Sequence, residues 1–363
     1  MTSQFNPEGD PSSLAPVEIV TRRPPPPPRR RSAVGLVLML LLVLALGGSM
    51  LLNFTLLVGG ALDSGREVKE KFYSHARTGT QKVAILSVEG MILDGEGFVK
   101  RQIDRAIKDD SVKAVVLRVD SPGGSVNAAD YLYHHLRKLG EDSKKPIVVS
   151  MGGVAASGGY YCAMAVGATP DTIFAEPTTW TGSIGVIIPH YNVVALMKQW
   201  GVKDDSIVSH PLKDALSITR EMSESERQLV QALVDDAFGR FKDVVKYGRP
   251  KFQKDTTALD KLATGQVFTA NQAKEAGLVD KIGYVEEAID RAIELARLDK
   301  ADVRVVKYEP EPSLSNILFG AQSQSPRWDL ARGMDLAQLL SVTSPRAYYL
   351  CSWIPSLVQP AKP

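Results

Sequence analysis

One serine lies in a stretch with almost no side-chain bulk. Ser157 occupies GGVAASGGYY, residues 152–161, after the apolar run KPIVVSM and before a run of helical character. This order places its hydroxyl at the first turn of a predicted helix, where unpaired N–H groups and the positive end of the helix dipole stabilise an oxyanion. The serine could attack a carbonyl, with the N–H of Gly158 holding the oxyanion. From these residues alone, a serine that merely caps the helix is the alternative.

A second glycine pair stands in an equivalent position. The motif DSPGGSV, residues 120–126, follows the apolar run KAVVLRV and precedes another predicted helix. Loops at the carboxyl ends of neighbouring parallel strands converge on one crevice, so the N–H of Gly124 is predicted as the second oxyanion donor. Ser121 and Ser125 are the competing nucleophiles. Ser125 is predicted to cap the helix that starts at Val126, and Ser121 precedes a proline in a turn.

A serine nucleophile needs a group that removes its proton. The histidines are His75, His134, His135, His190 and His210. Among them His190, in GVIIPHYN, is the one predicted to lie in a loop after the serine's helix, and a His190-based peptidase stays open. Lys213, in SHPLKDAL, is another candidate, because burial lowers a lysine pKa from about 10.4 by about 3 units. Spacing alone does not separate Lys213 from Lys198 or Lys203.

The elements around these residues alternate between strand and helix. Apolar runs at 82–88, 113–119 and 145–151 read as strands, and the segments between them show helical spacing. This order predicts right-handed crossovers and a largely parallel sheet in an α/β fold. Further on, Ser223 and Glu226 form a capping box that opens a long predicted helix with one apolar face.

Composition narrows the class of protein. The 363 residues are 44% hydrophobic and 23% charged, which is typical of a globular chain, and the net charge of +2 gives no field that would favour nucleic acid. Cys162 and Cys351 are too few for a disulfide framework and are predicted to be unpaired thiols. No His/Cys cluster has metal-ligand spacing, so neither a metal nor a cofactor is expected.

The chain ends differ from its middle. Residues 1–32 are rich in proline and arginine and are predicted to be disordered. Residues 33–60 carry no charge and exceed the roughly 20 residues of a transmembrane helix. The arginines before them predict a cytoplasmic N-terminus and an extracytoplasmic remainder; a cleaved signal peptide is the alternative. Residues 61–80 are predicted as a juxtamembrane linker, and 309–363 as an irregular tail with a late apolar cluster, RAYYLCSWIPSLV.

Five motifs occur in an informative order between residues 81 and 308: DSPGGSV, MGGVAASGGYY, TGSIGV, SHPLKD and TGQVFTANQAKEAGLVDKIG. Together they resemble the half-length, single-domain members of the signal peptide peptidase A (SppA) family. The resemblance implies a Clp protease/crotonase-like α/β fold and a membrane-anchored serine endopeptidase that cleaves remnant signal peptides. It implies Ser157 as nucleophile, Lys213 as general base, Ser183 as the hydroxyl that orients the lysine, and Gly124 and Gly158 as oxyanion donors.

The resemblance also implies a homo-oligomer in which neighbouring protomers share active sites, in the inner membrane of a bacterium. Because signal peptides are apolar, small or aliphatic side chains are the expected substrate preference. Two other functions fit the same fold. One is a crotonase-type acyl-CoA enzyme, which needs the oxyanion glycines but not the serine, and the other is a catalytically idle membrane scaffold.

Overall fold

The computed structural model describes residues 33–62, 68–310 and 347–351. The chain divides into two compact units, Met1–Ala61 and Leu62–Pro363. The first unit contributes α1 (Ala33–Leu62), a helix where the sequence predicts one. Within the described residues, no helix has the combined length and apolar character needed to cross a membrane. The transmembrane segment therefore stays a prediction, and the predicted disorder of 1–32 lies outside the described residues.

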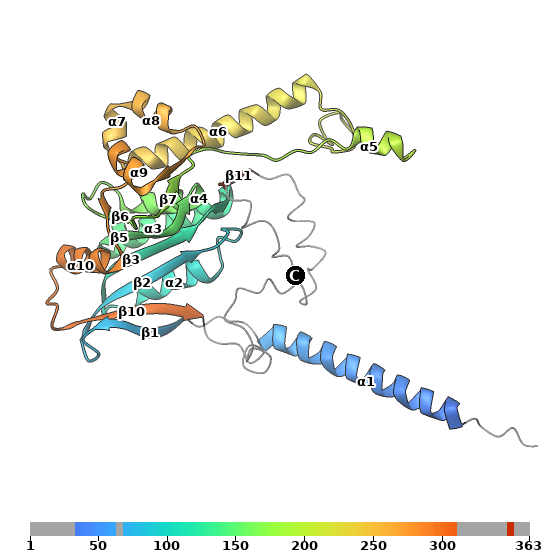
Figure 1. Cartoon of the computed structure of the whole chain (residues 1–363), viewed down its shortest axis with the longest axis horizontal. Coiled ribbons are helices and arrows are strands. Elements are labelled where there is room, and N and C mark those ends of the chain that lie inside the picture. Colours follow the sequence, from blue (N-terminus) through green and yellow to red (C-terminus); the bar gives the residue numbers. More distant parts are fainter. Residues whose placement is uncertain (1–32, 63–67, 311–346, 352–363) are drawn as a thin grey trace, which may run out of the picture. The chain divides into compact units, whose positions relative to one another are not determined.

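A nine-stranded sheet is the framework of the second unit (Figure 1). The sheet order is β1-β10-β2-β3-β5-β6-β9, and β7 joins β5 to β8. Its strands are β1 (Val68–His75), β2 (Gln81–Glu89), β3 (Val112–Ser121), β5 (Ile147–Ala156), β6 (Ile173–Ala175), β7 (Trp180–Gly182), β8 (Val267–Thr269), β9 (Lys281–Ile282) and β10 (Val303–Pro310). Neighbours along this path run parallel from β10 to β9, which confirms the predicted α/β class with a largely parallel sheet.

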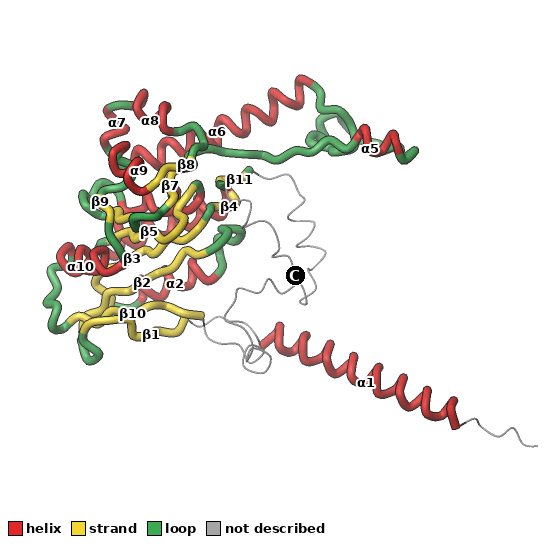
Figure 2. Tube along the Cα trace, in the orientation of Figure 1, coloured by secondary structure: helices red, strands yellow, loops and turns green. Residues whose placement is uncertain are grey.

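Helices cover both faces of this sheet (Figure 2). The helices of the second unit are α2 (Phe98–Lys108), α3 (Val126–Ser143), α4 (Gly158–Ala163), the 3-10 turn η1 (Met164–Val166), α6 (Glu224–Gly248), α7 (Lys251–Lys254), α8 (Thr256–Leu262), α9 (Ala270–Ala276) and α10 (Val285–Leu295), together with α5 (Val194–Gln199), which lies away from the sheet. Successive strand residues point to opposite faces. Leu86 and Leu117 therefore belong to the larger core with α2, α3 and α4, whereas Ile85 and Val116 pack with α10.

The folded body is longer than the sequence predicts. Strand β1 lies in the segment 61–80 that was expected to be a linker, and it pairs antiparallel with β10, Val68 opposite Pro310. The linker prediction is wrong for this strand. Half-buried and exposed residues alternate along VKEKFYSH, and none is fully buried, so the sequence looks like a polar connection between elements. The predicted tail also contributes structure: β11 (Tyr348–Leu350) pairs with β4 (Gly123–Ser125) in a two-stranded sheet.

A long arm leaves the body of the second unit between β7 and α6. We define it as residues 188–223, which include α5, and Figure 1 shows it extending beyond the sheet together with the start of α6. None of residues 187–225, all of them described, is buried. The predicted capping box of Ser223 and Glu226 is confirmed at its end. The apolar face predicted for α6 is buried only toward its C-terminus; Leu229 and Leu233 are exposed.

Candidate active site

Ser157 stands at the N-cap of α4, directly after β5, as the sequence predicts. Its backbone has φ 54° and ψ −114°, a conformation that costs energy for any residue other than glycine and that is concentrated at functional sites. Two hydrogen bonds hold it there: its N–H donates to the Gly182 carbonyl at 2.8 Å, and its carbonyl accepts from Tyr161 N at 2.8 Å. The strained turn is thus fixed from β7 and from the first turn of α4.

The hydroxyl of Ser157 is buried without a partner. The residue is 1% exposed, and its Oγ makes no hydrogen bond within the described part of the chain. A buried polar atom without a partner costs about 1–3 kcal/mol and requires an explanation. A nucleophile whose proton acceptor comes from elsewhere is one such explanation, whereas a cap is not, because the side chain makes no capping bond.

The two predicted oxyanion glycines lie together. A Cβ built on Gly158 would stand 3.2 Å from the backbone N of Gly124, so the backbones of the two glycines are in close contact beside Ser157. Gly123 has φ +97°, and a Cβ there would stand 2.6 Å from Gly158 N. Only glycine fits at this position, since any side chain would strike the backbone of the opposite loop.

The late strand β11 covers these glycines. Tyr349 pairs with Gly124, and a Cβ built on Gly158 would stand 3.2 Å from the Tyr349 carbonyl oxygen. On its other edge, Tyr348 exchanges two backbone hydrogen bonds with Ile187. The Tyr349 side chain is fully buried; its ring stacks on Tyr161 at 4.9 Å, and its hydroxyl donates to the Ala237 carbonyl at 2.8 Å. The sequence offered only the apolar cluster as a sign of this contact.

Ser183 is brought beside Ser157 from β7. It has φ 50°, is 4% exposed, and follows Gly182, whose carbonyl holds the Ser157 N–H. Its Oγ donates to the Gly265 carbonyl at 3.2 Å. Ser183 therefore lies next to Ser157, and the described partner of its hydroxyl is a backbone oxygen rather than an amine.

Ser121 and Ser125, the alternative nucleophiles, make contacts that stabilise the local structure. Ser121 is buried, and its Oγ accepts a hydrogen bond from Gly123 N at 3.1 Å. The helix α3 starts at Val126 as predicted, with Ser125 at its N-cap position but without a capping bond from the side chain. Ser125 instead pairs through its backbone with Tyr348 in the two-stranded sheet.

Lys213 lies apart from Ser157 in the single chain. It is exposed, within a turn of the arm, and its side chain makes no hydrogen bond or ion pair with any described residue. Its backbone N–H donates to the His210 carbonyl at 2.8 Å. His190 lies in the same arm, where its Nε2 is 3.2 Å from the Ser217 carbonyl oxygen. Within residues 33–62, 68–310 and 347–351, Lys213 therefore lacks the apolar surroundings expected for a lysine base.

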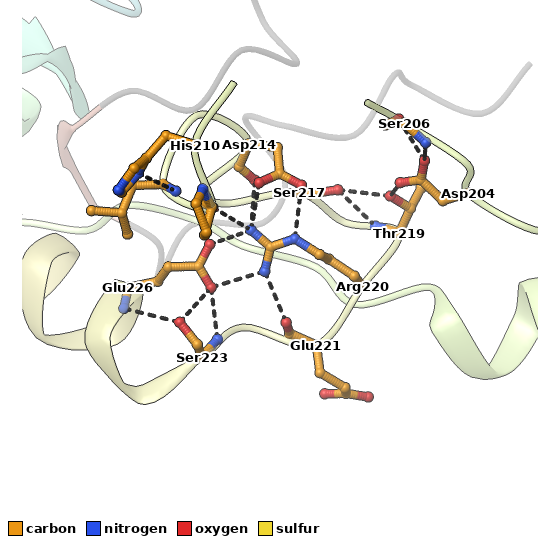
Figure 3. Close-up of polar contacts among 12 residues, drawn as sticks. Asp204, Ser206, His210, Asp214, Ser217, Thr219, Arg220, Glu221, Ser223 and Glu226 are labelled. Atoms are coloured by element: carbon orange, nitrogen blue, oxygen red, sulfur yellow. Dashed lines mark hydrogen bonds and ion pairs between the residues drawn. The ribbon is translucent and has the colours of Figure 1, made fainter. Parts of the chain in front are cut away.

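A polar network next to Lys213 escaped the sequence analysis (Figure 3). Arg220 binds both oxygens of Asp214, through Nε and one terminal nitrogen, each at 2.8 Å. It also donates to both oxygens of Glu226, at 2.9 Å to Oε2. The hydrogen bond from Arg220, with those from Ser223, lowers the pKa of Glu226 to about 2. The capping box was the feature of the sequence that could have indicated this network, because it predicts a fixed position for the Glu226 carboxylate.

Other titratable groups near α4 are structural. Cys162 and Cys351 are unpaired, as predicted, and burial raises the pKa of the Cys162 thiol to about 12. A thiol in this state is a poor nucleophile at neutral pH. Among the residues that the structure describes, no group of three or more His, Cys, Asp or Glu side chains could hold a metal ion.

Comparison with known proteins assigns the class. The mostly parallel α/β architecture fits a Clp protease-like fold, and residues 140–299 match peptidase family S49. The chain is 37% identical to a putative protease of Synechocystis over 67% of its length and 85% of that protein. It is 38% identical to a putative signal peptide peptidase SppA of Enterococcus faecium, over 63% of this chain and 67% of the relative.

A longer relative gives the same result. Protease 4 of Salmonella typhi is 35% identical over 68% of this chain, but the match covers only 39% of that protein. The chain therefore belongs to peptidase family S49 and, within it, is an SppA-family protease.

Proposed function

We propose that this protein is a serine endopeptidase in which Ser157 is the nucleophile and Lys213 the general base. One observation carries the proposal: a serine hydroxyl that is buried without a described partner, on a strained turn directly beside the backbones of Gly124 and Gly158. That arrangement is what acyl transfer requires, since the N–H groups can stabilise the oxyanion as it forms. Membership of a peptidase family supports peptides as the substrates.

The reaction follows from these groups. The neutral Lys213 amine takes the proton from Ser157 Oγ while Oγ bonds to the peptide carbonyl carbon, and the N–H groups of Gly124 and Gly158 hold the oxyanion. The C–N bond then breaks as Lys213 returns the proton to the leaving amine. Water, deprotonated by the same amine, attacks the acyl-enzyme and releases the acid, which restores Ser157. Ser183 orients the lysine in this scheme.

The base comes from a second copy of the chain. Lys213 is exposed on an arm that also exposes large apolar side chains, among them Trp200 at 76% and Ile207 at 100%. Packing this surface against another copy would remove the apolar area and the lysine from water together. Desolvation is the condition under which a lysine amine is neutral and basic near pH 7, so a shared site explains both features.

The proposed setting is a membrane. The charge-free residues 33–60 anchor the chain, with the arginine-rich N-terminus in the cytoplasm and the protease outside it. Remnant signal peptides are the proposed substrates, in line with the name of the Enterococcus relative.

A subunit-mixing experiment tests this function. Full-length Ser157→Ala and Lys213→Ala chains should each lose at least about 10³-fold in peptide hydrolysis while keeping their fold. Co-refolding equal amounts should restore about a quarter of the wild-type activity, because random assembly places an intact serine opposite an intact lysine in that fraction of sites. No restoration would contradict sharing between copies, and full activity of Lys213→Ala would remove the lysine as base.

The same variants separate the other functions. An acyl-CoA enzyme on this fold would keep its activity in Ser157→Ala, because it needs the oxyanion N–H groups and not the hydroxyl. An idle scaffold would hydrolyse no peptide in any form and would not be acylated at Ser157 by a serine-directed fluorophosphonate. Labelling of Ser157 in the wild type, together with its loss in Lys213→Ala, is the result that the proposed peptidase requires.

A further inference from the structure

The guanidinium group of Arg220 contacts the residues on both sides of Lys213 in the chain. Arg220 binds the Asp214 carboxylate with two nitrogens, each at 2.8 Å. The terminal nitrogen that binds Asp214 Oδ1 also donates to the backbone carbonyls of Pro211, at 3.4 Å, and of Asp214, at 3.3 Å. The contacts therefore lie before and after Lys213 in the chain, and a two-pronged pair of this kind fixes direction as well as distance.

The other side of the guanidinium is attached to a rigid element. Glu226 is 2% exposed and occupies the third position of α6. Its Oε2 accepts from Ser223 N at 2.7 Å and from Ser223 Oγ at 2.8 Å, besides the bond from Arg220 at 2.9 Å. Arg220 thus connects the Lys213 turn to the start of a helix whose far end is packed in the body (Figure 3).

The turn has little else to hold it. Residues 201–213 are all exposed, so no buried side chain packs the turn onto the arm. Leu216 has φ 67°, a strained conformation for a branched-chain residue, which the surrounding contacts must maintain. Local bonds such as that from Leu212 N to His210 Nδ1, at 3.2 Å, act within the turn, whereas Arg220 is the described side chain that ties it to α6.

We propose that Arg220 is a positioning residue: it fixes the Lys213 turn to the start of α6, so that the arm presents Lys213 in one orientation to the Ser157 of another copy. The inference rests on the proposed function, because it concerns the proposed base. Its physical basis is that a displacement of about 1 Å at a catalytic group can cost about 10²-fold in rate. Lysine can replace arginine only in part here, since an ammonium keeps the charge but lacks the planar fork that spans two carboxylates.

Steady-state kinetics of the full-length assembled protein test this role. Arg220→Gln should lower kcat by about 10- to 100-fold and leave KM within about threefold, because the serine, the oxyanion donors and the peptide groove are untouched. Arg220→Lys should recover part of the loss by restoring charge without the fork. Arg227→Gln is the matched control: this arginine follows Glu226 in the first turn of α6, is exposed, and makes no side-chain ion pair with a described residue, so kcat should stay within about twofold.

A double-mutant cycle identifies the contact. Asp214→Asn should lower kcat by a similar factor, and Arg220→Gln combined with Asp214→Asn should be little worse than either single variant, because both remove the same ion pair. If instead the double variant lost kcat by the product of the two single losses, the two residues would act separately, and the proposal would be overturned.

Two further outcomes distinguish failure of the positioning role from failure of the proposed function. If Lys213→Ala is inactive while Arg220→Gln matches Arg227→Gln, the positioning role is wrong and the proposed function stands. If Lys213→Ala is fully active, the proposed function fails first. Light scattering on each variant checks assembly: a fall in kcat that follows a fall in assembled mass means that Arg220 supports the oligomer rather than the orientation of Lys213, which also overturns the proposal.

Discussion

The proposed catalytic residues lie in two regions that are held by different forces. Around Ser157, two parallel strands and the start of α4 enclose the residue, which is 1% exposed. Around Lys213, no side chain from 187 to 225 is buried, and the order comes from hydrogen bonds and ion pairs. The first region is enclosed by residues of its own chain, whereas the second exposes the Lys213 side chain, which has no hydrogen-bond or ion-pair partner among the described residues.

This difference indicates what each region tolerates. Close-packed interiors do not accept even one added carbon without strain, so the Ser157 region should respond to small changes of shape. A polar network on an exposed arm should respond instead to changes of charge, of pH and of the surface that another copy covers. The following predictions use this contrast, beginning with the largest effect.

A methyl group at Gly123 should abolish activity. Its Cβ would stand 2.0 Å from the Tyr349 carbonyl oxygen and 2.6 Å from Gly158 N, at a φ of +97°. Gly123→Ala should lower kcat/KM by at least about 10²-fold because the oxyanion donors are displaced. The matched control is Gly153→Ala on β5, the strand that leads to Ser157, where the atom nearest to the added Cβ is Asp120 Oδ1 at 3.8 Å. Equal activity of the two variants would contradict a shape-sensitive Ser157 region.

Removing one apolar side chain from the arm should weaken assembly and activity together. Trp200→Ser should shift the oligomer toward smaller species in sedimentation velocity and lower specific activity by about tenfold at low protein concentration. The activity should return as the concentration rises. Tyr73→Ser, at an exposed aromatic on β1, should change neither quantity. A concentration-independent loss would mean that the arm is not an interface between copies.

Deleting residues 347–363 should expose the glycines of β4. A fluorophosphonate should then label Ser157 several-fold faster than in the full chain, because β11 no longer pairs with Gly124. The same deletion should lower stability by about 3 kcal/mol, the cost of losing one buried aromatic side chain. Unchanged labelling would mean that β11 does not restrict access to the serine.

Acid should loosen the arm before the body. The pKa of Glu226 is lowered from 4.5 to about 2, chiefly by its hydrogen bond to Arg220. A lowered carboxyl pKa stabilises the arm above about pH 4.5, and this contribution disappears as the pH falls toward 2. Limited digestion with pepsin should therefore cut within 204–216 increasingly over that interval. Glu226→Gln should already be cut at pH 5, and pH-independent cutting of the wild type would contradict the role of this carboxylate.

The sequence was most informative where local signals and tertiary structure agree. The strand-helix alternation predicted the parallel sheet, and the position of Ser157 after an apolar strand predicted its place at the start of α4. The convergence of Gly124 and Gly158 followed from topology alone, since loops at the ends of adjacent parallel strands meet.

The failures concern contacts between distant segments. Nothing local to VKEKFYSH shows that it pairs with β10, and nothing local to Tyr349 shows that it lies across Gly124. Arg220 escaped notice because an arginine near two acidic residues is usually a solvated surface group. Its importance depends on the burial of Glu226, and burial is a property of the fold rather than of the sequence nearby.

The strand that pairs with Gly124 belongs to the same polypeptide as the serine it covers. Its hold on β4 therefore does not weaken on dilution, as an oligomer contact would. Any extended peptide that needs the same edge can bind only during the fraction of time when β11 is detached, and its apparent affinity is reduced by that fraction. The ligand concentration needed for binding is thus set by the chain itself. A change that detaches β11 would lower that concentration without altering any of the reacting atoms.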